Sequence, residues 1–227
     1  MARIGPQDSG EEMSKILIIG AHGKVAQLAI PLLAEAGHEV LGAIRNPEHA
    51  DDITAAGATP VRADVENMTQ DEIADLLEGT DVVLWSAGAG GGDARRTWAV
   101  DRDAAIRSMD AAAEAGSPHF VMVSYFGAGP DHGVPEDNSF YAYAEAKAAA
   151  DEHLKASALP WTILRPSTLT LDEPTGRLDT EATEAGEVSR GNAARLLTAV
   201  VDNREANRGR IISFNDGETP VEQVAAG

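Results

Sequence analysis

Residues 15–26 read KILIIGAHGKVA, an apolar run that ends in two glycines and continues into a helix-compatible sequence. The pattern predicts a strand, a tight turn at Gly20 and Gly23, and the start of a helix. Gly20 can adopt a backbone conformation that is closed to other residues, and Gly23 lets a phosphate approach the main chain. Free N–H groups at the helix start lie at the positive end of the helix dipole. The segment therefore predicts a diphosphate site for a dinucleotide, although small residues at such a turn also serve packing alone.

The chain has 227 residues, enough for one domain with a continuous core, and it has no cysteine. Disulfides and thiolate chemistry are thereby excluded, and the reducing cytoplasm is the expected compartment. Residues 1–12 have no apolar core, so they predict a disordered leader rather than a signal peptide or a membrane span. We expect a single domain over residues 13–227.

The charge balance limits the partners that we expect. Acidic residues number 37 and basic residues 18, which gives a net charge of −19. Nucleic acid is not an expected partner, because a phosphate backbone needs concentrated Lys and Arg. We expect a small-molecule substrate, no membrane contact, and a monomer or homodimer. An anionic ligand of such a chain must find locally placed cations.

Apolar segments alternate with helical ones along the chain. The predicted further strands are Glu39–Ile44, Thr59–Arg62, Asp81–Trp85, Phe120–Ser124, Trp161–Leu164 and Arg210–Phe214, and the predicted helices are 24–36, 70–77, 94–115, 139–156 and 192–201. Strands of continuous Val, Ile and Leu imply burial on both faces, and their alternation with helices implies parallel crossovers. We therefore expect a doubly wound parallel α/β sheet of the Rossmann type, with a small C-terminal substrate-binding part. In such sheets ligands bind beyond the carboxyl ends of the strands.

Arg45 ends the second predicted strand, where a dinucleotide fold places the group that meets the adenosine ribose. An Asp or Glu there suits NAD, whereas an Arg suits the 2'-phosphate of NADP. The chain has Arg45 followed by Asn46 and no carboxylate, and Lys24 in the glycine turn is a second candidate cation. The predicted cofactor is therefore NADP (NADPH). The alternative is a surface Arg and a helix-start Lys without a ligand.

Tyr143 and Lys147 are four residues apart in a segment of helical character, so they share one helix face. A positive charge near a phenol lowers its pKa by favouring the phenolate. Tyr143 could then donate a proton to a carbonyl oxygen as hydride arrives, or accept one in reverse. Ser124, at the end of a strand, could hydrogen-bond the same oxygen. Tyr141 has no Lys four residues later, and each feature alone also fits simple packing.

Together these features resemble the short-chain dehydrogenase/reductase superfamily, and within it the atypical branch of NAD(P)H-binding, epimerase/dehydratase-like proteins. The resemblance runs from about Lys15 to Val221. It is carried by the glycine turn, Arg45, Asp64, residues 86–89 (SAGA), residues 121–124 (VMVS), Tyr143 with Lys147, and residues 162–166 (TILRP).

The resemblance implies a cofactor site along the strand ends and a catalytic set of Ser124, Tyr143 and Lys147. It places Asp64 and Val65 at the adenine, residues 86–89 along the cofactor, and residues 166–168 near the nicotinamide amide. The candidate cofactor-binding residues are Gly20, His22, Gly23, Lys24, Val25, Arg45, Asp64, Val65, Ser86, Ala87, Gly88, Ala89, Pro166, Ser167 and Thr168.

Two positions depart from the family pattern. His22 replaces the usual small residue in the turn, so its ring is expected either against a phosphate or in solvent. Asn192 stands where relatives commonly have Asp, which weakens any role assigned to that helix start. The remaining histidines (His38, His49, His119, His132 and His153) show no ligand spacing with carboxylates, so no metal site is expected.

The predicted function is an NAD(P)H-dependent oxidoreductase that acts on a small carbonyl or quinone-like substrate. A sugar epimerase or dehydratase remains an alternative, which the absence of a long C-terminal substrate domain disfavours. A non-catalytic NADPH-sensing regulatory protein and an interaction protein without cofactor are further alternatives. Residues 127–138 predict either a loop that closes over the substrate or a plain surface connection.

Overall fold

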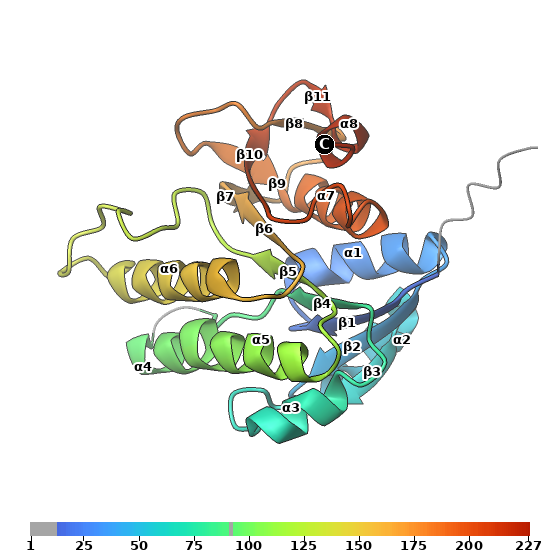
Figure 1. Ribbon diagram of the computed structural model, residues 1–227. Coiled ribbons are helices and arrows are strands. Elements are labelled where there is room, and N and C mark those ends of the chain that lie inside the picture. The colour runs from blue at the N-terminus through green and yellow to red at the C-terminus, as the bar shows by residue number, and fades with distance from the viewer. Residues whose placement is uncertain (1–12, 91–92) are drawn as a thin grey trace, which may run out of the picture.

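A computed structural model of the protein describes residues 13–90 and 93–227. Its centre is a nine-stranded sheet of order β11-β8-β10-β6-β5-β4-β1-β2-β3, with helices on both faces (Figure 1). The strands from β3 to β10 in this order are all parallel, and β8 runs antiparallel to β10 and β11. The predicted doubly wound parallel fold is confirmed. The predicted leader, residues 1–12, lies outside the described residues.

The elements have the following bounds. The strands of the main sheet are β1 (Lys15–Ile19), β2 (Glu39–Ile44), β3 (Thr59–Arg62), β4 (Val82–Trp85), β5 (His119–Val123), β6 (Trp161–Pro166), β8 (Arg177–Asp179), β10 (Arg210–Asp216) and β11 (Thr219–Pro220). A separate parallel pair consists of β7 (Thr168–Thr170) and β9 (Glu187–Ser189). The helices are α1 (Lys24–Glu35), η1 (Pro47–His49), α2 (Ala50–Ala56), α3 (Gln70–Leu76), α4 (Ala94–Thr97), η2 (Trp98–Ala104), α5 (Ala105–Glu114), α6 (Tyr141–Ala156), α7 (Arg190–Asp202) and α8 (Val221–Ala225).

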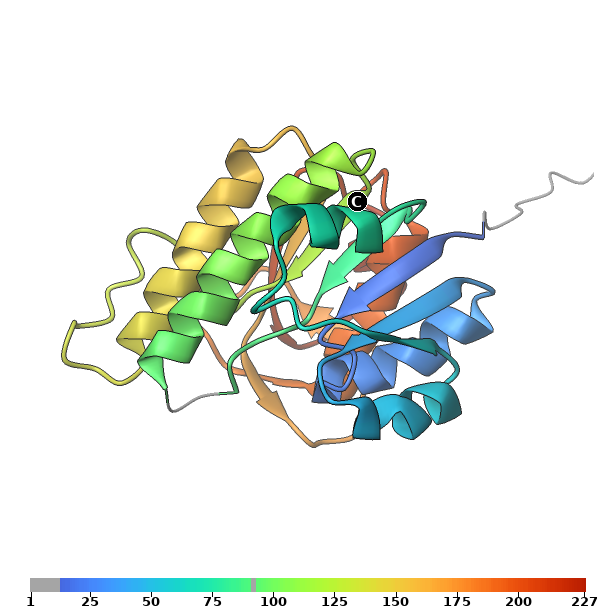
Figure 2. The same cartoon turned by 90° about the horizontal axis from the view of Figure 1, so that it is seen from below.

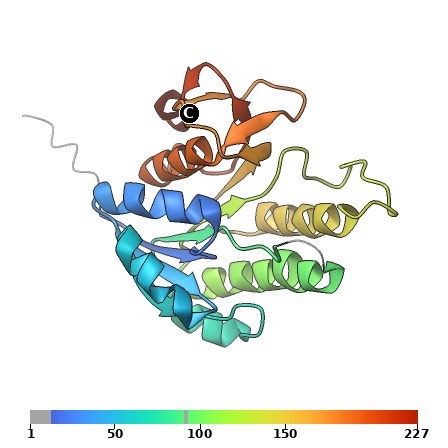
Figure 3. The same cartoon turned by 180° about the vertical axis from the view of Figure 1, so that it is seen from behind.

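Each face of the sheet packs against its own layer of helices (Figures 2 and 3). Successive side chains of a strand point to opposite faces, so Ile16 and Ile18 of β1 pack with apolar residues of α1, α2 and α7. Leu17 and Ile19 pack on the other face with residues of α3, α5 and α6. This burial on both faces is the reason why the strands are continuously apolar. None of the described helices has both the length and the apolar character needed to span a bilayer.

The turn between β1 and α1 lies directly against the segment that follows β4. Gly20 has a φ of +88°, and a Cβ built on it would lie 2.6 Å from the backbone N and Cα of Ala87. The Ser86 N–H donates to the Ile19 carbonyl at 2.9 Å, which fixes the approach. The special backbone conformation predicted for Gly20 is confirmed, and only glycine fits this contact.

The helix predicted over residues 94–115 has an irregular centre. It consists of α4, the π-helical segment η2 and α5. A π-helical turn carries an additional residue and is frequent at functional sites. Here it includes Asp101, whose side chain is buried. The short strands β7, β8, β9 and β11 were not predicted.

His119 is a buried titratable group at the start of β5. The Thr162 hydroxyl donates to the Asn207 carbonyl at 2.8 Å, so its oxygen accepts from His119 Nε2 at 2.9 Å and the ring carries its proton on Nε2. Burial, together with the charges of Arg204 and Arg208, lowers the pKa of His119 from 6.5 to about 4. The folded protein therefore keeps this ring neutral.

We expect the free energy of unfolding to fall as the pH drops from 6.5 towards 4. In this range the unfolded chain binds a proton at His119 that the folded chain excludes, which costs up to about 1.4 kcal/mol per pH unit. In the variant His119→Gln the free energy of unfolding should fall less per pH unit than in the parent. Urea unfolding of both proteins at several pH values checks this, and identical slopes would contradict it.

Candidate functional site

Two adjoining hollows lie at the carboxyl edge of the parallel strands. The first, of about 350 Å³, lies beyond β1, β2 and β3, and the second, of about 840 Å³, lies beyond β4 and β5. Both are lined by Gly23 and by residues 86–90. They therefore meet where the sheet order reverses between β1 and β4, the place where α/β sheets bind ligands.

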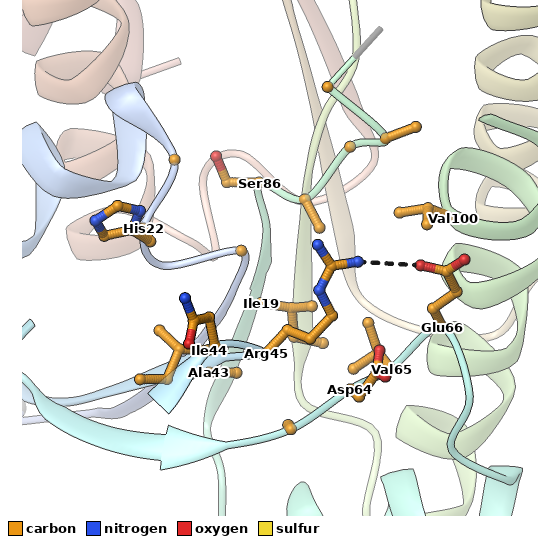
Figure 4. Close-up of a pocket in the computed structure, with 18 of the residues that line it drawn as sticks. Ile19, His22, Ala43, Ile44, Arg45, Asp64, Val65, Glu66, Ser86 and Val100 are labelled. Carbon is orange, nitrogen blue, oxygen red and sulfur yellow. Dashed lines mark hydrogen bonds and ion pairs between the residues drawn. The ribbon is translucent and has the colours of Figure 1, made fainter. Parts of the chain in front are cut away.

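Two guanidinium groups from different segments lie in the first pocket. Arg45 follows β2 and its side chain is 56% exposed, and its Nη1 lies 3.4 Å from the Glu66 carboxylate (Figure 4). The same carboxylate oxygen lies 3.3 Å from Nε of Arg96, whose Nη1 also donates to the Ala89 carbonyl. Asp64 and Val65 line this pocket as well. Glu66 thus brings a negative charge close to both guanidinium groups.

The His22 ring is held by two neighbours at the same pocket. It stacks on His49 with the ring centroids 3.5 Å apart, and its Nε2 lies 3.0 Å from the Asp52 carboxylate. The ring is therefore engaged within the protein rather than directed freely into solvent.

Tyr143 and Lys147 both line the second cleft from α6, as their spacing predicts. Lys147 is 1% exposed, and its Nζ donates to the Val123 carbonyl at 2.8 Å and to Met122 Sδ at 3.3 Å. Asp101 also lines the cleft and accepts a hydrogen bond from the Ala89 N–H at 3.0 Å. Burial lowers the pKa of Lys147, while the charges of Asp151 and Asp101 oppose that change.

The expected lowering of the phenol pKa is not found. Burial raises the pKa of Tyr143 above its usual range, and the negative charge of Asp101 raises it further. Burial likewise raises the pKa of the Asp101 carboxyl, against the charge of Lys147. Tyr143 therefore keeps its proton at neutral pH.

Ser124 lies in the same cleft, but its hydroxyl has a partner inside the protein. Ser124 Oγ donates to Asp151 Oδ2 at 2.9 Å. That oxygen also accepts from Arg165 Nε at 3.1 Å and from Nη2 at 3.0 Å. Burial raises the pKa of the Asp151 carboxyl, and the charges of Lys147 and Arg165 oppose this. The predicted carbonyl anchor is thus part of a buried ionic network.

The structure separates some residues that the sequence grouped together. Lys24 and Val25 line the second cleft and do not line the pocket that contains Arg45, so Lys24 is not a second cation beside it. Residues 166–168 line neither hollow, and the Ser167 hydroxyl instead donates to the Asn215 side-chain oxygen. Asn192 donates to Asp216 Oδ1 at 2.6 Å and accepts from the Gly176 N–H at 2.7 Å. An Asp at position 192 would repel Asp216.

A sequence profile described as NAD(P)H-binding matches residues 20–204 of this chain. The chain belongs to this NAD(P)H-binding family. A Bacillus subtilis protein named as an uncharacterized sugar epimerase, YhfK, is 32% identical over 92% of this chain and 98% of its own length.

Two solved structures are also similar to this member of the NAD(P)H-binding family. A Bacillus halodurans protein described as an NAD-dependent epimerase/dehydratase superposes with a TM-score of 0.85 at 29% identity, covering 93% of this chain and 98% of the other. The oxidoreductase YlbE from Lactococcus lactis superposes with a TM-score of 0.82 at 26% identity, covering 93% and 94%. The epimerase/dehydratase-like resemblance is thereby confirmed.

Several residues of the candidate site carry no signal in the sequence. Glu66 and Arg96 lie beside Arg45 in the first pocket, although they come from different segments. Asp101 lines the second cleft together with Lys147 and comes from the π-helical segment η2. Asp151 lies on the same helix as Tyr143. The chain has 37 acidic residues, so no sequence pattern distinguishes this one as part of the site. Across residues 13–90 and 93–227, no cluster of three or more His, Cys, Asp or Glu side chains could hold a metal ion.

Loss of the Arg165 charge should destabilise the fold strongly. Arg165→Met leaves a fully buried carboxylate without its ion-pair partner, which costs about 3 kcal/mol of unfolding free energy at pH 7. The cost should shrink as the pH is lowered below 7, because burial raises the pKa of Asp151 and the protonated carboxyl needs no counter-ion. Lys155→Met breaks the exposed pair with Glu152 and should cost less than about 1 kcal/mol. Urea unfolding measures both variants, and equal costs would contradict the prediction.

Proposed function

We propose that the protein is an NADPH-dependent oxidoreductase that reduces a carbonyl or quinone-like substrate in the second cleft. The observation that carries the proposal is a protonated, half-buried Tyr143 in a cleft that adjoins a cation-lined pocket across a glycine turn. A proton donor suits reduction, because the carbonyl oxygen needs a proton as hydride reaches its carbon. The predicted cytoplasmic location and the predicted monomer or homodimer stay predictions.

The residues present fit a nicotinamide dinucleotide. The glycine turn between β1 and α1 offers main-chain N–H groups for a diphosphate, midway between the two hollows. We assign the adenosine to the pocket of Arg45, Asp64 and Val65. We assign the nicotinamide to the cleft of Tyr143 and Lys147, beside residues 86–89.

The reduction needs one proton from the protein. When bound, the reduced nicotinamide supplies a hydride to the carbonyl carbon. Tyr143 holds the proton at its phenol oxygen and gives it to the carbonyl oxygen, so that an alcohol forms. The phenolate left on Tyr143 is stabilised by the charge of Lys147, one helical turn away. Lys147 also has a third N–H for a ribose hydroxyl.

Ser124 can donate a hydrogen bond to the carbonyl oxygen of the substrate if its hydroxyl rotates away from Asp151. The Asp151 carboxylate then keeps both hydrogen bonds from Arg165, so the rotation leaves no buried charge without a partner. In this proposal Ser124 donates to the carbonyl oxygen during the reaction and to Asp151 otherwise.

Preference for NADPH rests on Arg45. Arg45 and Asn46, rather than a carboxylate, directly follow β2 in the sequence, and Arg96 and His49 line the same pocket. A guanidinium contact with a 2'-phosphate is worth about 1.5 to 3 kcal/mol. Glu66 opposes that contact, because its carboxylate lies 3.4 Å from Arg45. The ratio of NADPH affinity to NADH affinity therefore depends on the attraction of Arg45 and the repulsion of Glu66.

Titration of both cofactors by fluorescence tests this balance. The parent should bind NADPH about tenfold or more tightly than NADH, and Arg45→Glu should reverse the preference. Glu66→Gln is the matched variant and should strengthen NADPH binding while leaving NADH binding nearly unchanged. Added salt should weaken NADPH binding more than NADH binding. Equal affinities in the parent would rule out the assignment of Arg45.

Removal of the Tyr143 hydroxyl tests the chemistry. A panel of quinones and aldehydes with NADPH identifies a reducible compound. With that compound, Tyr143→Phe should lower turnover by about 100-fold or more and leave NADPH affinity unchanged. Tyr141→Phe, two residues earlier on α6 and outside the cleft lining, should keep the parent rate.

The opposite result favours the alternative function. If Tyr143→Phe stays within about threefold of the parent, the transfer does not use this hydroxyl. If no compound in the panel is reduced although NADPH binds, the NADPH-sensing protein becomes the better account.

A further inference from the structure

The second cleft presents an aromatic surface at its mouth. Phe140 lines the cleft and is 42% exposed. Its ring centroid lies 5.1 Å from that of Tyr143 and 5.2 Å from that of Tyr125, so its position is fixed by two neighbouring rings. A rigid aromatic side chain with a large exposed face is suited to stacking against a flat ligand.

The remaining walls leave room for such a ligand. Alanines at positions 87, 89, 94 and 142 line the cleft, together with the half-buried Leu169. Short apolar side chains keep the cleft wide, and its volume of about 840 Å³ is in the range of small-molecule sites. The cleft can therefore hold a flat apolar body beside the nicotinamide.

A guanidinium group lines the same cleft. Arg190 is the first residue of α7, and its Nη1 donates to the Thr170 carbonyl at 2.7 Å. Among the residues that the structure describes, no carboxylate lies within ion-pair distance of Arg190. Of the five donors of a guanidinium, one is used by Thr170, and the others can form a planar fork for an oxyanion.

We infer that the substrate is an aromatic carboxylic acid, with its ring against Phe140 and its carboxylate on Arg190. The inference rests on the proposed function and names the substrate class for that site. A carboxylate fits better than a phosphate, because Asp93 and Asp101 line the same cleft and repel a dianion more strongly than a monoanion. In a chain of net charge −19, Arg190 supplies the local cation that an acid requires.

Binding of matched probes tests the inference without turnover. The probes are benzoylformate, 2-naphthoate and anthraquinone-2-carboxylate, each beside its neutral amide, with phenyl phosphate as the dianion. Ligand-observed NMR titrations use the full chain with and without saturating NADP⁺. At least one acid should bind about tenfold more tightly than its amide and more tightly than phenyl phosphate.

Substitutions on α7 test whether the Arg190 guanidinium causes the preference for the acid over the amide. Arg190→Gln should remove the preference for the acid and leave amide binding unchanged, and Arg190→Lys should retain part of the preference. Arg195→Gln, an exposed position on the same helix outside the cleft lining, should behave as the parent. Thermal melting confirms that each variant is folded; if Arg190→Gln does not fold, Arg190→Lys carries the comparison.

Two outcomes would overturn the inference. One is that no acid binds better than its amide, including the case in which no probe binds. The other is that a folded Arg190 variant keeps the full preference for the acid. NADPH titration of the same samples separates this inference from the proposed function. Acid selectivity without NADPH binding contradicts only the function, and NADPH binding without acid selectivity contradicts only the substrate class.

Discussion

The close approach of the β1–α1 turn to the segment after β4 is the constraint on which the site depends. Gly20 meets the backbone of Ala87 at a distance that excludes any side chain, and the hydrogen bond from Ser86 to Ile19 fixes this distance. One hollow lies on each side of this contact, and residues 86–90 line both. A ligand that fills both hollows must cross the glycine turn, where the main-chain N–H groups of the first turn of α1 have no intrahelical acceptor and favour an anion. The shape of the groove therefore suits a long molecule with a charged centre.

Burial determines the chemistry of the second cleft more than neighbouring charge does. Tyr143, Lys147, Asp101 and Asp151 all lie close to the ends of β4 and β5, and for each of them burial is the largest cause of the pKa shift, in favour of the neutral form. The acids and the lysine reduce one another's shifts, because opposite charges face each other in a poorly solvated space. The result is a tyrosine that retains its proton beside a lysine that can stabilise the phenolate. Such an arrangement suits proton donation.

The sequence predicted the parallel sheet and the strand-end residues, because the glycine turn and the doubly buried strands carry strong local patterns. It also predicted that Tyr143 and Lys147 share a face, since helical periodicity fixes that relation. It could not predict Glu66 beside Arg45 and Arg96, or Asp151 beneath Ser124, because these contacts join residues 21 to 30 positions apart through tertiary packing. The short strands β7 to β9 depend on their pairing rather than on their own sequence. The raised pKa of Tyr143 was not predicted either, since burial is not visible in the spacing of residues.

A crystal structure of the protein with NADP⁺ tests the central claim most directly. The account predicts the 2'-phosphate within ion-pair distance of Arg45, the diphosphate at the turn from Gly20 to Gly23, and the nicotinamide in the cleft beside Tyr143. A cofactor bound elsewhere would contradict it. So would a nicotinamide outside that cleft, or a 2'-phosphate in solvent while Arg45 remains paired with Glu66.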